Sequence, residues 1–590
     1  MKKNYILAIT LCSLVFIGGM VIQGVLYKNL PKAETSNLPA VSAQTEQVPN
    51  GQKPTQSAFV VSVSETTSDE ASKTEQTFVV ETDLVRATFT NKGGDIISYK
   101  LKQHNVSGSG ENVEMIKNIT EQNRAFAIAL GGYTAPILDT IFDTREETGA
   151  NGEKIISFSG TVALKKATGE IETLKLSKHF RFLPNEYLFE LAVTIDGGEN
   201  FSGLNFGDIA YTLRTAPQIG PSWNKNDRYD FRRFSLLING KRKDTTVKAG
   251  EIKTGASGGS WVAVSGKYFT LAVVPDKTIG SVHFAADASN RQFETENTQA
   301  FISEAALVGT SLQHRYRIYM GPTGEKYLYR YANQTKNAFA VGNLGLENLA
   351  SSSGVLAPVI FVLKYLLQFV YGFVKNWGVA IIIVTIFIRL LLLPISIKSM
   401  VGTQKIQPYQ ARISEIQQKY RTNPQKMQEE LNKIYKQAGY TPGCASGCLP
   451  LIIQFAVIIA MFQLFNNYFE FRGAVFIPGW ISDLSIGDSV YRFKNPLPIL
   501  RWTDLRLLPI IYVATQYIST LFMRKTPQPQ QTQGMMFMMM YIAPAMFFFV
   551  LYNAPSGLFV HWIVSNLLMV VQQLITNSIV EKENLTKKVG

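Results

Sequence analysis

The sequence predicts a polytopic α-helical membrane protein with six transmembrane helices, a large all-β domain outside the membrane and a helical hairpin in the cytoplasm. Three observations predict this fold class. The run from Tyr5 to Tyr27 is uncharged and long enough to span a bilayer. Five further apolar runs lie between residues 377 and 577. Residues 78–335 instead contain short apolar runs that alternate with turn signals, which is typical of β-strands.

The first apolar run is interpreted as a signal anchor, residues 1–27, that is not cleaved. It exceeds the usual length of the apolar region of a signal peptide, and Cys12 follows Leu11 rather than a small residue. Two lysines precede it and place the N-terminus in the cytoplasm. Residues 28–77 are rich in Ser, Thr, Gln, Glu and Pro, so we expect a disordered linker there.

Residues 78–335 predict a large all-β domain, most simply a sandwich. The expected strands are Phe78–Val80, Val85–Thr90, Ile155–Phe158, Tyr187–Ile195, Trp261–Val264, Tyr268–Val274 and Tyr316–Tyr319. No cysteine occurs between Lys28 and Gly443, so this domain has no disulfides. It has no catalytic signature, and its four histidines are expected at the surface. They are His104, His179, His283 and His314.

Residues 336–376 predict a connector followed by an amphipathic helix that lies on the membrane surface. The stretch 354–374 is apolar but is interrupted by Pro358 and Lys364. The next apolar run begins only a few residues later, and two full crossings would need a very tight turn. An interfacial helix therefore explains the pattern better than a span.

Five spans follow, and their loops predict the orientation. The spans are residues 377–397, 449–468, 505–523, 535–552 and 557–577. The loop 398–447 and the tail 578–590 carry an excess of Lys and Arg, whereas the loop 469–504 balances its charges. Basic loops remain in the cytoplasm. The N- and C-termini are thus expected inside, and the β domain outside.

The cytoplasmic segment 398–447 predicts a helical hairpin. Apolar residues recur at helical spacing from Ile406 to Tyr420 and again from Met427 to Ala438. A turn is expected near Thr422–Pro424, and Gly439 closes the second helix. The charges of this hairpin are either a solvated face or a contact for ribosomes, lipid headgroups or a nascent chain.

Composition excludes several classes of function. The formal net charge is +14, but Lys and Arg are spread along the chain with their sharpest excess beside membrane segments. This favours anionic lipid over nucleic acid as a partner, and no nucleic acid is expected as a specific ligand. Cys444 and Cys448 have no histidine nearby, so neither a metal site nor a cofactor is predicted.

Arg389 is the most informative residue of the chain. It is the only formal charge in the interior of the five C-terminal spans, and it lies roughly 18 Å along a helix from Trp377. A charge at that depth costs about 2.5–3.5 kcal/mol on insertion scales. Two interpretations stay open at this point. The side chain either reaches the cytoplasmic headgroups or borders a hydrated groove.

The other polar residues of the spans separate the remaining classes. Thr385 lies one turn before Arg389 on the same helix face, and no Asp or Glu occurs within the five C-terminal spans. Ion-coupled transporters usually need such a carboxylate. Common nucleotide-binding, hydrolase and metalloprotease motifs are also absent from the sequence, so no enzyme is predicted.

Three sequence features together carry a family resemblance. They are Arg389 in the second span, the stretch Gly447–Gln454 at the start of the third, and the sixth-span residues Pro555–Leu558, Ile563–Asn566 and Gln572–Gln573. They resemble the YidC/Oxa/Alb family of membrane-protein insertases. The six-span layout with a large β domain after the first span resembles the Gram-negative form, and the likeness extends over nearly the whole chain.

This resemblance implies a function and partners. Members insert and help fold nascent inner-membrane proteins, alone or beside the Sec translocon, without hydrolysing nucleotides. It implies a multi-pass protein of a Gram-negative inner membrane whose periplasmic domain is a β-supersandwich. Ribosomes, through the hairpin and the basic tail, and membrane lipid are further expected partners. A small-solute transporter or channel, and an envelope scaffold anchored by its helices, remain as alternatives.

The resemblance also implies site residues. Arg389, Thr385 and Gln454 match a hydrophilic groove that opens to the cytoplasm, and Phe455 and Ile458 match an apolar slide along which a substrate helix leaves. Enterobacterial members commonly have paired tyrosines where this chain has His561 and Trp562, which are expected beside the slide.

Two expectations follow from residue chemistry at these positions. Trp562 keeps an aromatic ring without a hydroxyl, and His561 is either a pH-sensitive contact or a packed ring. The methionines of Met535–Met540 are expected to offer an adaptable surface or to face lipid.

Overall fold

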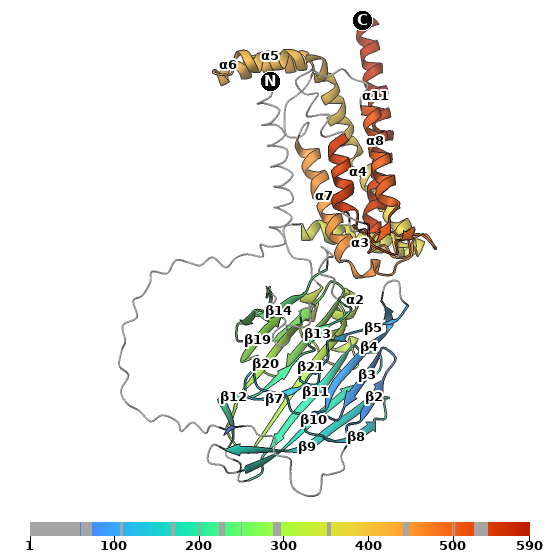
Figure 1. The fold of residues 1–590 in the computed structure, drawn as a ribbon. Coiled ribbons are helices and arrows are strands. Elements are labelled where there is room, and N and C mark those ends of the chain that lie inside the picture. Colours follow the sequence, from blue (N-terminus) through green and yellow to red (C-terminus); the bar gives the residue numbers. More distant parts are fainter. Residues whose placement is uncertain are drawn as a thin grey trace, which may run out of the picture. The chain divides into compact units, whose positions relative to one another are not determined.

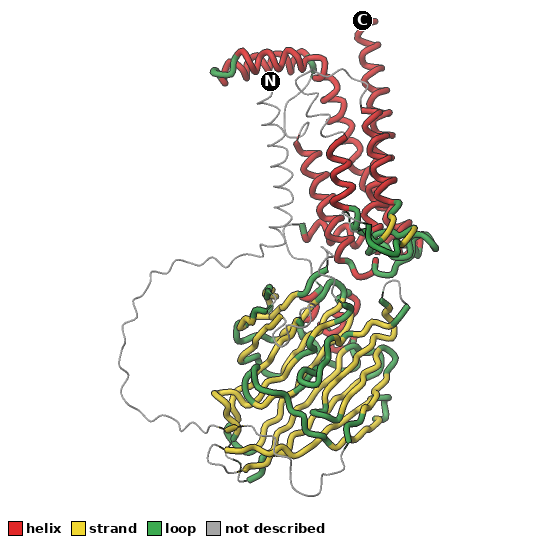
Figure 2. Tube along the Cα trace, in the orientation of Figure 1, coloured by secondary structure: helices red, strands yellow, loops and turns green. Residues whose placement is uncertain are grey.

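The computed structural model divides the chain into two compact units, residues 34–351 and residues 1–33 with 352–590. It describes residues 59–60, 74–106, 110–166, 171–199, 201, 203–222, 230–248, 250–286, 297–350, 356–439, 448–497, 500, 502–523 and 541–589. The predicted anchor, most of the predicted linker and the Met535–Met540 cluster lie outside these residues. Strands gather in the first unit and the long helices in the second (Figure 2).

The β unit is built from antiparallel sheets (Figure 1). The largest has ten strands in the order β1-β9-β10-β11-β21-β18-β17-β14-β15, and β8 also pairs with β9. Its strands are β1 (Phe59–Val60), β8 (Asp143–Thr148), β9 (Lys154–Lys166), β10 (Ile171–Phe182), β11 (Leu188–Asp196), β14 (Arg233–Ile238), β15 (Lys241–Thr245), β17 (Trp261–Ser265), β18 (Phe269–Pro275) and β21 (Ser311–Pro322).

Smaller sheets complete the unit. A five-stranded sheet contains β16 (Ile252–Thr254), β19 (Ser281–Ala286), β20 (Thr298–Leu307), β12 (Leu204–Arg214) and β7 (Ile128–Leu130), in that order. A four-stranded sheet contains β2 (Thr77–Glu81), β3 (Val85–Thr90), β4 (Asp95–Asn105) and β5 (Asn112–Glu114). β6 (Ile116–Lys117) pairs with β13 (Gln218–Ile219). The predicted β-rich domain is therefore confirmed.

Alternation along β10 explains how the sheets pack. The even-numbered residues from Leu174 to Phe182 are buried, while the odd-numbered residues from Lys175 to Arg181 are exposed or half-buried. A strand places successive side chains on opposite faces, so one face of β10 belongs to the core. There Phe180 meets Phe89 of β3, with ring centroids 4.9 Å apart. The four-stranded sheet thus covers the inner face of the ten-stranded sheet.

One inward position of β10 is a lysine. Lys178 has no exposed surface, and its ammonium donates to Asp95 Oδ1 at 2.6 Å, to Phe126 O at 2.8 Å and to Gly93 O at 3.1 Å. The other oxygen of Asp95 accepts from Arg124 Nε at 2.8 Å. Burial lowers the pKa of Lys178, and the Asp95 carboxylate opposes that shift. This ion cluster joins β10 to β4 inside the core.

Three of the four histidines, His104, His283 and His314, differ from the surface prediction. His104 is buried, and its Nε2 lies 3.0 Å from the hydroxyl of Tyr187. His314 is half-buried, and its Nδ1 lies 2.9 Å from the hydroxyl of Tyr211. His104 and His314 face tyrosines that supply a hydrogen-bonding partner inside the unit, which makes burial of the polar ring tolerable.

The β unit extends further along the chain than the sequence indicated. Short helices follow β21: α2 (Glu325–Leu328), η1 (Tyr329–Ala332), η2 (Gln334–Lys336) and η3 (Leu346–Leu349). The buried Glu186 carboxylate accepts from Tyr331 Oη at 2.7 Å and from the Ala338 amide at 2.7 Å. Trp261 Nε1 donates to Gly345 O at 3.2 Å. The predicted boundary at 335 was therefore too early, because these bonds attach residues 336–350 to the strands.

The helical unit has a helix within each of the predicted apolar runs that follow the β domain, although the structure describes only part of the run 535–552. The helices are α3 (Ala357–Val374), α4 (Trp377–Ile406), α7 (Cys448–Asn467), α8 (Leu508–Met523), α10 (Ala543–Leu551) and α11 (Ser556–Val589). Among the described residues, α3, α4 and Ser556–Glu581 of α11 are long and apolar enough to cross a membrane, while Phe455–Asn467 and Leu508–Phe522 are shorter. The α11 helix continues through the predicted tail, 578–590, as far as Val589.

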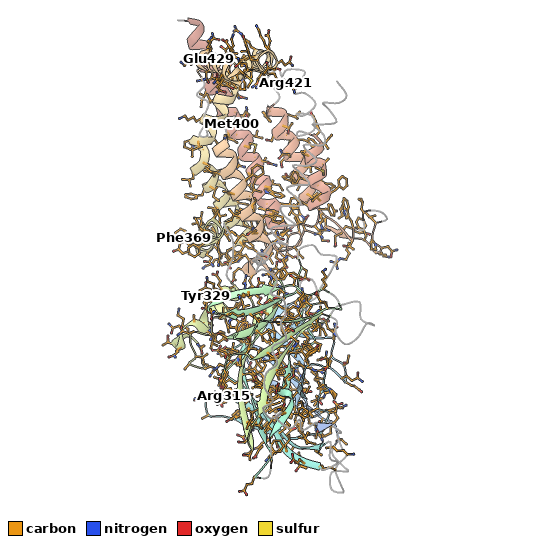
Figure 3. The ribbon with its side chains drawn as sticks, turned by 90° about the vertical axis from the view of Figure 1, so that its left-hand side faces the viewer. Arg315, Tyr329, Phe369, Met400, Arg421 and Glu429 are labelled. Carbon is orange, nitrogen blue, oxygen red and sulfur yellow. The ribbon has the colours of Figure 1, made fainter. Side chains whose placement is uncertain are left out.

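The contacts of α3 place it across the ends of its neighbours. Tyr371 stacks on Trp377, with centroids 4.0 Å apart, and Gln368 Nε2 donates to the Tyr468 hydroxyl at 2.8 Å. Lys364 lies over the same Tyr468 ring at 5.6 Å. About 10 Å of α3 thus meets a single cluster at the start of α4 and just after α7. Its exposed aromatic residues, including Phe369 (Figure 3), form a second, uncovered face.

Two shorter helices follow α4. They are α5 (Gln410–Lys419), after the single turn η4 (Gln407–Tyr409), and α6 (Pro424–Gln437). Ile406, Ile413, Leu431 and Ile434 form their shared core. The Asn423 side chain accepts from the Lys426 amide at 3.1 Å and so caps α6.

Candidate functional site

Arg389 is a half-buried cation without a partner in the helical unit. No hydrogen bond or ion pair to its guanidinium is present among the residues that the structure describes. On a helix of 100° per residue, Arg389 lies about 40° around α4 from Thr385 and about 20° from Met400. Both of those residues contact α11. Arg389 therefore lies near the α11 side of α4 rather than on its lipid side.

Thr385 and His561 join α4 to α11. Thr385 has no exposed surface and His561 retains 5% of its surface. Thr385 Oγ1 donates to Ile381 O at 2.6 Å and lies 2.8 Å from His561 Nδ1. Arg389 lies one turn after Thr385 on α4, and Thr385 contacts His561. Thr385 and His561 are thus both buried where α4 meets α11.

The two helices run parallel along a polar seam. Gln572 Nε2 donates to Met400 Sδ at 3.0 Å, and Gln404 Nε2 donates to Asn577 Oδ1 at 2.8 Å. Together with the Thr385–His561 contact, these pairs define the alignment of the two helices. Each residue of α4 lies at the same height as the α11 residue that follows it by 172 to 176 positions. Arg389 is then level with the stretch from His561 to Ser565. Met400 marks the seam in Figure 3.

The opposite face of α11 packs on α8. Asn566 Nδ2 donates to Thr515 Oγ1 at 3.3 Å, and the half-buried Trp562 lies 5.3 Å from the Tyr512 ring. Ser565, Gln572, Gln573 and Thr576 of α11 are also buried polar residues. The amides and hydroxyls noted in the sequence thus meet between α4, α8 and α11, an arrangement that only the helix register reveals.

The predicted slide lies on α7. Phe455 is 54% exposed and Ile458 is half-buried, so α7 offers an apolar surface here. Gln454 precedes Phe455 in the same helix, and its side chain is outside the described part of the chain. Of the two predicted slide residues on α7, Phe455 is therefore the exposed one.

One end of the bundle is closed by the segment between α7 and α8. This segment contains η5 (Phe469–Phe471), β22 (Tyr491–Arg492) and β23 (Asp504–Leu505). Its Leu484 and Ile486 carbonyls accept from the first residues of α11, Gly557 N at 3.1 Å and Ser556 N at 2.7 Å. A Cβ at Gly557 would approach Phe465 to 3.0 Å, which explains a glycine there.

A buried carboxylate fixes this segment to α8. Asp488 Oδ2 accepts from Leu507 N at 2.8 Å, Leu508 N at 3.1 Å and Trp480 Nε1 at 3.0 Å. These bonds satisfy donors at the start of a helix, where no intrahelical partner exists. The sequence analysis did not identify this cap, although an Asp-rich loop before an apolar run was the available signal.

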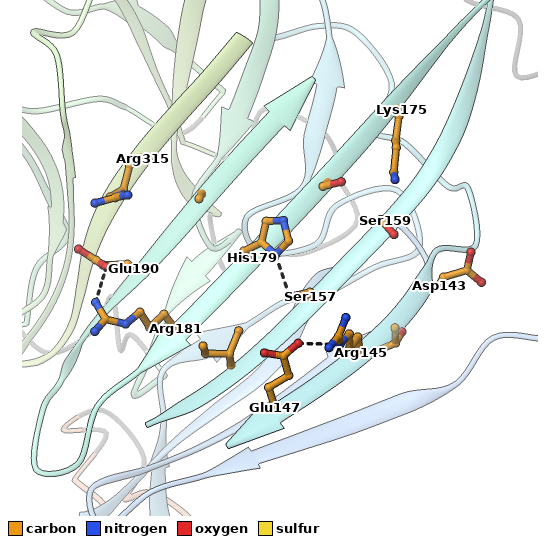
Figure 4. Close-up of a pocket in the computed structure, with 14 residues that line it drawn as sticks. Asp143, Arg145, Glu147, Ser157, Ser159, Lys175, His179, Arg181, Glu190 and Arg315 are labelled. Atoms are coloured by element: carbon orange, nitrogen blue, oxygen red, sulfur yellow. Dashed lines mark hydrogen bonds and ion pairs between the residues drawn. The ribbon is translucent and has the colours of Figure 1, made fainter. Parts of the chain in front are cut away.

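The β unit holds a separate polar pocket of about 840 Å³ on the outer face of its largest sheet (Figure 4). Glu147 pairs with Arg145 at 2.6 Å and Glu190 with Arg181 at 3.1 Å. His179 Nδ1 lies 2.7 Å from Ser157 Oγ. This hydroxyl–imidazole pair sits in mid-strand, where the ladder uses the backbone N–H groups, so no oxyanion hole faces it. No metal-binding cluster occurs among the described residues.

Comparisons with known proteins agree on one family. Its models match this chain as "60Kd inner membrane protein" over residues 369–583 and as "YidC periplasmic domain" over residues 77–346. The chain is 46% identical to the membrane protein insertase YidC of Treponema denticola, over 99% of this chain and 100% of that protein. It is 36% identical to the YidC of Treponema pallidum, over 98% of each. A crystal structure of an active YidC insertase matches 85% of this chain and 92% of its own, with 18% identity and a TM-score of 0.33.

Proposed function

The chain belongs to the YidC family of membrane protein insertases, and from this premise we propose that it inserts nascent proteins through a hydrated groove that contains Arg389. The observation that carries the proposal is the Arg389 guanidinium inside an apolar helix, which has no hydrogen bond or ion pair to any residue that the structure describes. A fixed structural cation would be expected to have a fixed anion. A cation that receives passing groups has to remain free.

The groove reduces the cost of moving a polar segment through hydrocarbon. Arg389 offers charge-assisted hydrogen bonds to acidic side chains and to backbone carbonyls of that segment. The apolar helix of the substrate then enters lipid and gains about 25 cal/mol per Å² of buried apolar surface. This gain is large enough for short segments, so we assign the chain no enzymatic activity.

The neighbouring residues take distinct roles in this proposal. Thr385 and His561 hold the wall behind Arg389, since their polar atoms bind each other. Gln454 borders the groove from α7. Phe455 and Ile458 offer the apolar surface along which the substrate helix leaves, and Trp562 lies beside the way out.

Closure at one end supports a groove that opens at the other. The segment between α7 and α8 is bonded to the starts of α8 and α11, and this end is proposed to face the periplasm. The opposite end, which leads to α5 and α6, faces the cytoplasm. This orientation gives cytoplasmic termini, a periplasmic β unit and six spans in the inner membrane. It places α3 on the periplasmic surface of that membrane.

Partners follow from the same orientation. Nascent membrane proteins are the substrates, and the Sec translocon is a proposed partner for larger ones. The α5–α6 hairpin and the end of α11 carry many lysines and arginines, which favours contact with ribosomes or anionic lipid. No cofactor and no specific nucleic acid are needed.

Site-specific photo-crosslinking tests the proposal. A photoreactive residue at Phe455 is expected to capture a nascent single-span protein, while one at Phe369, an exposed phenylalanine of α3, is expected to capture lipid. Insertion of that substrate into liposomes that contain only this protein is the second readout. Capture of lipid alone at both positions, together with a solute flux, would instead indicate a transporter. Loss of function after deletion of the β unit would indicate a scaffold.

A further inference from the structure

The hydrogen bonds of Thr385 determine where the protons of His561 lie. The hydroxyl lies 2.6 Å from Ile381 O and 2.8 Å from His561 Nδ1. A hydroxyl has one proton, and a carbonyl oxygen can only accept. The proton of Thr385 therefore goes to Ile381, and Nδ1 must donate its own N–H to Thr385. This bond fixes both the tautomer and the orientation of the ring.

The second nitrogen of His561, Nε2, is left as an acceptor. A second proton would place a charge on a ring that keeps only 5% of its surface, and the five C-terminal spans contain no Asp or Glu to pair with it. The ring is therefore neutral and keeps a lone pair on Nε2. Within the described part of the chain, Nε2 has no hydrogen-bond partner, and it is not among the polar atoms sealed from the surface.

A donor and an acceptor thus stand at one level of the bundle. Arg389 presents N–H groups and His561 presents the Nε2 lone pair, and the helix register places Arg389 level with His561–Ser565. A peptide unit carries the complementary pair, a carbonyl that accepts and an N–H that donates. Both groups of a polar segment are costly to leave unpaired where little water is present.

We propose that His561 Nε2 binds the polypeptide backbone of the substrate. It accepts a hydrogen bond from a substrate N–H while Arg389 donates to a neighbouring carbonyl oxygen. The inference rests on the proposed function, because it requires a substrate segment beside Arg389. Every non-proline residue offers these two groups, so this pair receives polar segments largely independently of their side chains. Thr385 is a positioning residue that holds the ring.

Two variants separate the two nitrogens of the ring. His561→Asn carries its amide nitrogen near the position of Nδ1 and has no atom at Nε2, so it keeps the bond to Thr385. His561→Gln carries its amide near the position of Nε2 and loses that bond. Two synthetic single-span substrates complete the design. Their translocated segments are short runs of glycine or of sarcosine (N-methylglycine), and sarcosine keeps the carbonyl and lacks the N–H.

Insertion rates into liposomes that contain the full chain give the result. His561→Asn is expected to slow the glycine substrate about threefold to tenfold, the worth of one hydrogen bond, and to match wild type on the sarcosine substrate. His561→Gln is expected to keep at least half of the wild-type rate on the glycine substrate. Arg389→Ala is expected to slow both substrates, because both keep their carbonyls.

Other outcomes overturn the inference in distinguishable ways. Equal slowing of both substrates by His561→Asn would show that the ring only supports the fold, and no slowing of either would show that Nε2 binds nothing. If Arg389→Ala still slows both substrates in these cases, only the role of His561 fails. If Arg389→Ala also leaves both rates unchanged, the groove charge fails with it. Equal melting temperatures of the variants in liposomes exclude misfolding.

Discussion

The chain buries two cations in opposite ways. Lys178 in the β unit has no exposed surface, and its ammonium is bound by one carboxylate and two carbonyls. Arg389 lies half-buried in α4 without any partner among the described residues. Both sites take a charge away from bulk water, which is costly. Only one of them supplies a replacement for that water.

The difference shows what each charge is for. A buried ion pair is favourable only when its geometry is good and the remaining hydrogen-bonding groups are satisfied, and the Lys178 cluster meets both conditions. Its role is to hold two sheets together. The guanidinium of Arg389 has no such partner among the described residues, and the proposed function leaves it for groups that arrive and leave.

The largest effect is expected from Asp95→Ala. This change leaves Lys178 and Arg124 without their shared carboxylate, and breaking a buried pair typically costs about 3–5 kcal/mol. Hydrogen exchange of the full chain should show reduced protection of β9, β10 and β11. The matched control is Asp139→Ala, since Asp139 also binds Arg124 but its side chain is 47% exposed. That change is expected to cost less than about 1 kcal/mol. Equal costs would mean that burial of the cluster does not determine its strength.

Arg389→Leu is expected to give the opposite result. The free energy of unfolding of the helical unit should stay equal or rise, because an unpaired charge is removed from an apolar segment. Insertion of substrates with acidic translocated segments should nevertheless slow by about tenfold to a hundredfold, the worth of one charge-assisted hydrogen bond. Arg389→Lys should be milder. A loss of helix stability in Arg389→Leu would show that this arginine is structural, like Lys178.

The isolation of Arg389 could be predicted from the sequence more easily than the pairing of Lys178. The isolation of Arg389 was visible, because the five C-terminal spans contain no Asp or Glu. The alternation of Leu176, Lys178 and Phe180 also indicated that Lys178 points inward. Its partner Asp95, however, lies on β4, and sequence periodicity cannot show which strand packs against β10. The bond between Thr385 and His561, which are 176 residues apart, depends in the same way on how α4 and α11 are aligned.

A smaller effect is expected at the closed end of the helical unit. Asp488 resembles Lys178 in having its hydrogen bonds inside the protein, so Asp488→Ala should destabilise the start of α8 by about 1–2 kcal/mol. Labelling of a cysteine introduced at Ser485 by a water-soluble thiol reagent should become faster. Asp488→Asn keeps an oxygen for the two amides and should fall between wild type and Asp488→Ala. Unchanged labelling in both variants would show that Asp488 does not keep this end closed.

The smallest effect is expected at His283, whose buried Nδ1 has no hydrogen-bond partner among the described residues. His283 stacks on Tyr133 with centroids 4.2 Å apart. Burial lowers the pKa of His283 from the ordinary value of 6.5. The unfolded chain then binds more protons than the folded chain below about pH 6.5, so acidification should weaken the β unit as pH falls from there toward the lowered pKa. His283→Phe keeps the stacked ring and removes the titrating group, and hydrogen exchange of β19 should show a shallower pH dependence than in wild type. An identical pH dependence in both proteins would assign the acid sensitivity to other groups, and His283 would then behave as a ring that only packs.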